Sequence, residues 1–116
     1  MKPVNLAEKL AAFDGTWSPR IVGAFNGHDI MVVKVRGEFV WHDHADTDDF
    51  FMVLKGRLEI DLPDGQVTLE PGEIFVVPRG IPHRPRADEE THLLLIEPAG
   101  TPNTGDPATA TAKERI

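Results

Sequence analysis

The chain has 116 residues, a net charge of −7 and no cysteine. Its length suits one domain with one core, and its acidic charge argues against a nucleic-acid partner, because phosphate backbones require a basic surface. Without cysteine, thiol nucleophiles, disulfides, zinc ribbons and iron–sulfur clusters are excluded. No apolar run approaches the roughly 20 residues that cross a bilayer, and no signal peptide is visible, so we expect a cytoplasmic protein.

The predicted elements begin with a short helix and continue as strands. Asn5 can cap a helix that ends at Asp14-Gly15, and Asn26-Gly27 is typical of a two-residue hairpin turn. The strands are predicted over 20–25, 29–35, 38–44, 48–54, 57–62, 66–69, 73–77, 83–87 and 91–97.

Short strands separated by glycine and proline predict an all-β barrel or sandwich. We expect three parts: an N-terminal helix and arm over 1–19, the β domain over 20–97, and an extended or disordered tail over 98–116.

Histidines and a carboxylate form the most informative pattern. His42 and His44 are two residues apart, so they share a face if 38–44 is a strand. Asp49 follows closely, and His83 comes after a Pro-x-Gly turn. Imidazole and carboxylate together favour a divalent transition metal, and four such ligands would leave coordination positions open.

Two segments around these residues resemble the two signature motifs of the cupin superfamily. The motif positions, in chain order, are His42, His44, Asp49 and Gly56, then Gly72, Pro78, Gly80 and His83. The residues around these positions are similar to those of small single-domain bacterial cupins, many of them labelled mannose-6-phosphate isomerase-like. The resemblance implies a single conical, jelly-roll-like antiparallel β-barrel. It also implies one divalent metal ion inside it, bound by His42, His44, Asp49 and His83.

The sequence departs from the family pattern at several positions. Asp49 stands where the family usually has glutamate, so its oxygens begin about 1.5 Å nearer the backbone. The metal is then expected either nearer that strand or bound to Asp49 through water. Four residues rather than five separate Gly37 from His42, and Ala87 replaces the family's final asparagine.

Further residues are predicted around the site. Val40, Phe51 and Val53 would give a small-molecule ligand an apolar wall, and Arg79 is a candidate for binding an anionic group. Glu38 shares the predicted strand face of His42 and is a candidate catalytic base.

An apolar stripe is predicted on the outside of the barrel. Phe50, Met52 and Leu54 alternate with the inward residues of their strand, and an exposed stripe of this kind needs cover. The N-terminal helix or a second subunit could supply it, which favours a homodimer.

Three functions remain open at this stage. The first is a metalloenzyme acting on a small organic molecule, by isomerase- or dioxygenase-type chemistry. The second is a non-catalytic cupin that binds or senses a small molecule or metal. The third is a metal-free structural domain with hydrogen-bonded histidines. Zinc, manganese, iron and nickel all suit the ligand set.

Overall fold

The helix α1 (Leu6–Ala11) begins at the predicted cap, where the Asn5 side chain accepts a hydrogen bond from the backbone N–H of Glu8 at 3.0 Å. The computed structural model describes residues 1–116 and contains this one helix. With six residues, α1 is far too short and too polar to cross a membrane. Its buried face, with Leu10, packs with Phe13 on Val22 and Val32 of the sheet.

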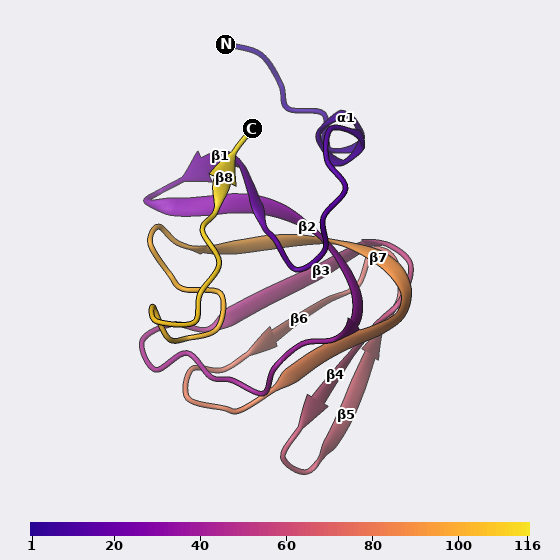
Figure 1. Ribbon diagram of the computed structural model, residues 1–116, viewed down its shortest axis with the longest axis vertical. Coiled ribbons are helices and arrows are strands. Elements are labelled where there is room, and N and C mark those ends of the chain that lie inside the picture. The colour runs from indigo at the N-terminus through magenta and orange to yellow at the C-terminus, as the bar shows by residue number, and fades with distance from the viewer.

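Eight strands form one strongly bent sheet (Figure 1). In chain order they are β1 (Arg20–Phe25), β2 (His28–Glu38), β3 (Asp49–Lys55), β4 (Leu58–Leu62), β5 (Gly65–Leu69), β6 (Ile74–Val77), β7 (Arg84–Pro98) and β8 (Glu114–Arg115).

The long strand β7 organises the sheet. Along one edge it pairs with β2, and along the other it pairs first with β4 and then with β3, which in turn pairs with β6. The order is β5-β4-β7-β2-β1-β8, with β3 and β6 off this path. The predicted all-β, barrel-like class is confirmed, although the hydrogen-bonded sheet curls without closing.

The inward face of the sheet forms the main core. Val33 and Val35 of β2, Phe51 and Val53 of β3 and Leu93 of β7 are buried there with residues of β4 and β5. Alternation along each strand places these side chains on one face, as expected for strands with one buried side.

The structure differs from the predicted strands at three places. Gly37 does not separate two strands: β2 runs through it to Glu38, with a bulge between Val35 and Gly37 where it pairs with β7. Beyond Glu38, the predicted strand over 38–44 is instead an irregular segment. Its Phe39 N–H donates to the Pro85 carbonyl at 2.9 Å, and His42 and His83 exchange backbone hydrogen bonds of 3.0 and 2.9 Å. Similarly, the predicted strands 83–87 and 91–97 are one continuous strand, β7.

The hairpin turn between β1 and β2 is as predicted. Asn26 and Gly27 both have positive φ, 49° and 76°, which is the backbone of the turn type that matches the twist of paired strands. Beyond β7, residues 99–116 turn back across one end of the sheet and finish as β8, parallel to β1 (Figure 1, yellow).

Candidate metal centre

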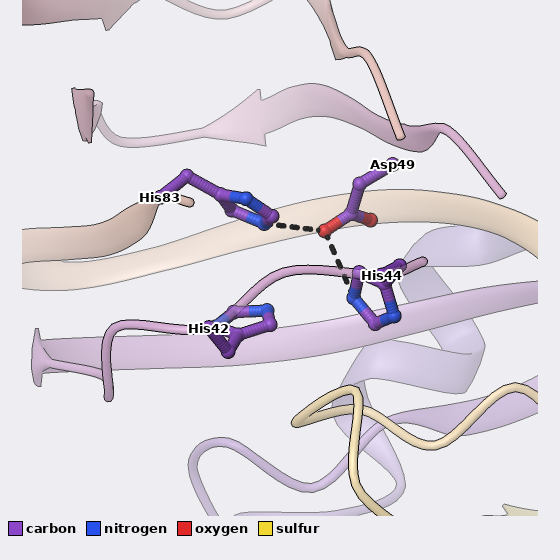
Figure 2. A group of neighbouring side chains, drawn as sticks. All are labelled: His42, His44, Asp49 and His83. Atoms are coloured by element: carbon purple, nitrogen blue, oxygen red, sulfur yellow. Dashed lines mark hydrogen bonds and ion pairs between the residues drawn. The ribbon is translucent and has the colours of Figure 1, made fainter. Parts of the chain in front are cut away.

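The three histidines and the aspartate predicted from the motifs meet at one end of the sheet (Figure 2). His42 and His44 come from the irregular segment between β2 and β3, Asp49 is the first residue of β3, and His83 directly precedes β7. One ligand atom from each side chain lies within 4.8 Å of the others. The structure therefore brings all four together, although His42 and His44 are not on a strand.

Backbone carbonyls fix the orientation of two imidazoles. Nδ1 of His42 lies 2.9 Å from the Val40 carbonyl, and Nδ1 of His83 lies 2.9 Å from the Ile81 carbonyl. Because a carbonyl oxygen only accepts, each Nδ1 must carry the hydrogen and donate it. Nε2 is thereby left to face the cluster, which is the arrangement of imidazoles prepared to bind a metal ion.

Asp49 lies at the centre of the cluster. Its Oδ2 is 2.8 Å from Nε2 of His83 and 3.4 Å from Nε2 of His44 (Figure 2, dashed lines). Burial alone would raise the pKa of Asp49, but hydrogen bonds to His44 and His83 outweigh it and lower that pKa to about 2. The carboxyl is therefore an anion at neutral pH, despite its burial.

The pKa values of two histidines move in opposite directions. Burial is the largest influence on His42 and lowers its pKa. Burial also opposes the charged form of His44, but the hydrogen bond and charge of Asp49 outweigh it and raise the pKa of His44. The difference follows from position, since of these two histidines His44 alone lies within ion-pair distance of Asp49.

The donor set fits a divalent transition metal. Its members are buried or half-buried, the orientation of His42 and His83 is fixed, and the carboxylate reaches the imidazoles despite lacking the family's extra methylene. These four residues could hold one ion, with imidazole nitrogen and carboxylate oxygen as ligands.

A small, mostly apolar cavity adjoins the cluster. Its volume is about 50 Å³, and His42, His44 and Asp49 form its polar end. The remaining lining is mainly hydrophobic: Trp17, Pro19, Val33, Val35, Phe39, Phe51, Pro85, Leu93 and Leu95, with Glu97 and Asn103. Trp17 and Phe39 stack there, with ring centroids 4.8 Å apart. Such a wall favours a small apolar ligand.

The predicted ligand-binding residues have different positions. Phe51 lines the cavity, whereas Val53 is fully buried in the core and is absent from the cavity lining. Val40 does not line the cavity and is 52% exposed. The reason is that the 39–44 segment is not a strand, so the alternation used to orient Val40 does not apply.

The predicted charged candidates also lie away from the cavity. Arg79 has a 63% exposed side chain that pairs with Asp48. Glu38 forms a 2.6 Å ion pair with Arg84 in a charged hollow on the surface, so it does not face the histidines. Each is held by a nearby opposite charge, which the sequence pattern did not reveal.

Sequence reasoning missed Glu97 as a cavity residue. Burial raises the pKa of Glu97, while the charge of Lys113, 2.6 Å away, opposes the shift. The signal was available, because Glu97 continues the inward alternation of Leu93 and Leu95. Trp17 had no such signal, since it reaches the cavity from the loop before β1.

The fold and the buried cluster define a small all-β domain with an interior site. The family profile described as "Cupin domain" matches residues 29–97, more than half of the chain. The chain therefore belongs to the cupin family.

Similar proteins agree with this assignment. A cupin-2 domain protein of Shewanella frigidimarina has a solved structure with a TM-score of 0.81 and 45% identity, covering 82% of this chain and 93% of that one. YdbB of Bacillus subtilis, an uncharacterised protein, is 34% identical over 66% of this chain and 68% of its own length. A 3-hydroxyanthranilate 3,4-dioxygenase of Brucella anthropi is also 34% identical. The matched part covers 65% of this chain and 46% of that enzyme.

Proposed function

We propose that this cupin binds one divalent transition metal ion through His42, His44, Asp49 and His83 and acts on a small organic molecule. The observation that carries the proposal is the convergence of three imidazoles and one carboxylate within 4.8 Å at the end of an apolar cavity. Bound there, the ion would supply Lewis-acid or one-electron chemistry at its open positions.

The chain's own residues have definable roles in this proposal. The carbonyls of Val40 and Ile81 hold His42 and His83 in their ligating tautomer. Asp49 contributes the single negative charge among the four ligands, so a divalent ion would keep a net positive charge toward the cavity. Phe51 and the stacked pair of Trp17 and Phe39 would hold an apolar ligand and limit access of water.

Of the two reaction classes, dioxygenase-type chemistry is favoured over isomerisation. The likeness to a 3-hydroxyanthranilate 3,4-dioxygenase supports it, as does the apolar cavity wall. Zinc, manganese, iron and nickel all fit the ligand set, and the metal found in the purified protein would separate the two classes.

The alternative is a cupin that binds a metal or a small molecule without turnover. It is supported by the positions of Glu38 and Arg79, which leave the cavity without the acid–base and anion-binding side chains that were expected. A tightly bound ligand recovered unchanged, with no product formed, would favour this function.

The experiment is elemental analysis of the untagged protein with matched histidine variants. We expect close to one equivalent of metal in the wild type and its loss in His42→Ala and His83→Ala. His28→Ala is the control, because its imidazole hydrogen-bonds to Asn26 of its own hairpin turn and lies outside the cluster. Metal retained in a His42→Ala/His83→Ala variant, or none in the wild type after reconstitution, would refute the site and favour hydrogen-bonded, metal-free histidines.

A further inference from the structure

Residues 99–116, called here the closing segment, contribute to the wall of the cavity. Asn103 of this segment lines the cavity together with His42 and His44. The segment then crosses to the far edge of the sheet, where β8 pairs with β1 and Glu114 forms a 2.8 Å ion pair with Arg20. The cavity is therefore bounded in part by a stretch of chain outside the main sheet.

A buried ion pair holds the closing segment to the cavity. Nζ of Lys113 lies 2.6 Å from Glu97, and their side chains are only 10% and 6% exposed. The same ammonium also donates to the Thr101 carbonyl within the segment. Since Glu97 lines the cavity, Lys113 ties the segment directly to the cavity wall.

A close backbone contact joins the segment to the metal-ligand loop. Gly105 has φ of +78°, and a Cβ at this position would overlap the carbonyl oxygen of Asp43. Asp43 lies between His42 and His44, so the segment rests on the backbone that carries two of the proposed ligands. Hollows flank this contact on both sides, between residues 39–43 and 104–111 and between residues 44–47 and 98–107. The segment is thus held at a few points rather than along its length.

The cavity is small compared with sites that hold cyclic ligands. Its volume of about 50 Å³ is far below the roughly 300–1,000 Å³ of pockets that hold drug-sized ligands. A ring-sized molecule requires more space. The strand residues of the wall are packed in the core, whereas Asn103 lies on the closing segment, which is held at a few points.

We propose that Lys113 is a specificity-determining residue of this site. Its pairing with Glu97 holds the closing segment over the cavity, so small ligands reach the cluster while ring-sized ligands enter only when this pairing opens. The inference rests on the proposed function, because the cavity is taken to be the place where a ligand reaches the metal. One of the two measurements below does not depend on a metal.

The first measurement uses protein loaded with Co²⁺ in place of the native metal. Association of azide and of imidazole is followed through the visible Co²⁺ absorption in the wild type, Lys113→Met and Glu114→Gln. Because the apparent rate scales with the open fraction, Lys113→Met should accelerate imidazole association about tenfold or more and change azide association less than about twofold. Glu114→Gln is the matched control, since it removes an ion pair of the same segment that does not touch the cavity.

The second measurement uses metal-free protein and the fluorescence of Trp17. With Trp41→Phe as background, Trp17 is the remaining tryptophan, and it lines the cavity. Acrylamide quenching should increase in Lys113→Met and stay at the wild-type value in Glu114→Gln. Increased quenching in a protein that takes up no metal would support the closing role of Lys113 while refuting the metal site.

One further variant separates opening from loss of folding. Lys113→Met leaves Glu97 buried without its partner, whereas Glu97→Gln/Lys113→Met removes both charges and should open the segment without that penalty. Unchanged imidazole association and unchanged quenching in the folded double variant would overturn the proposal. Equal acceleration of imidazole association in Glu114→Gln would also overturn the proposal, because any loosening of the segment, and not the pairing of Lys113 in particular, would then admit the larger ligand.

Discussion

Replacing Asp49 by asparagine tests the electrostatics of the cluster in the metal-free protein. Asparagine has nearly the same shape but carries no charge, so His44 and His83 lose their common anionic partner. The packing around β3 is kept, since the Asp49 side chain is only 10% exposed and no larger group is introduced. A change in stability can therefore be assigned to the charge rather than to a cavity.

The size of the effect follows from the pKa of Asp49. A decrease from 3.8 to about 2 on folding corresponds to about 2 kcal/mol of stability from this carboxylate. Because the folded pKa is depressed, this contribution is present above the unfolded value of 3.8 and is lost as the pH falls toward 2. About half of it should remain at pH 3.

The assay is urea denaturation of metal-free wild type and Asp49→Asn between pH 3 and 6. We expect a difference in unfolding free energy of about 2 kcal/mol at pH 5 that declines toward pH 3. Asp43→Asn is the control, because Asp43 is an exposed carboxylate of the same loop and should show no such difference. A difference for Asp49→Asn that does not depend on pH would refute the reasoning, since a loss of hydrogen bonds alone would produce it.

Three other predictions concern folding and assembly. Asn5→Ala should cost about 1 kcal/mol in urea denaturation because α1 loses its cap, and an unchanged midpoint would contradict that role. Ile60→Ala should cost about 2–5 kcal/mol by the same method, since Ile60 is fully buried in the core; a loss as small as that for a surface residue would be inconsistent with the packing. The homodimer was predicted from the stripe of Phe50, Met52 and Leu54, and in the structure Val76 and Ile74 pair with Phe50 and Met52 and are 44% and 59% exposed. Ile74→Glu/Val76→Glu should therefore convert the predicted homodimer to a monomer in analytical ultracentrifugation; a monomeric wild type would show that prediction to be wrong.

The elements predicted most accurately depend on local chemistry. Asn5 caps α1 because its side chain reaches an amide three residues away, and Asn26-Gly27 forms its turn because both residues tolerate positive φ. The bounds of β1 are those predicted, since the turn and the preceding proline limit the strand. Where the strand limits depended on Gly37, the prediction was wrong, because a bulge can absorb a glycine without ending the strand.

The histidine cluster was predicted from its motifs, but the physical reason first given for it was incorrect. Alternation along a strand was expected to aim His42 and His44 together, yet neither lies on a strand, and His42 is placed by its backbone bridge to His83. This bridge joins residues far apart in the sequence and has no local signal. The same error misplaced Val40, whose carbonyl, rather than its side chain, contributes to the site.

Two neighbouring inward carboxylates explain why one end of this sheet carries the site. Asp49 precedes Phe50, which pairs with Ile96, and Glu97 follows Ile96, so both acids lie at the same end of β3 and β7. Histidines near Asp49 lower its pKa, whereas burial raises that of Glu97 despite Lys113. Further along the same inward face, Phe51, Val53 and Leu93 are apolar, so the two carboxylates gather at this end. The pairing of Glu97 depends on a residue 16 positions away that returns to the sheet after an irregular turn. No periodicity in the sequence encodes that contact, which is why the cluster of histidines and aspartate was predictable and the wall beside it was not.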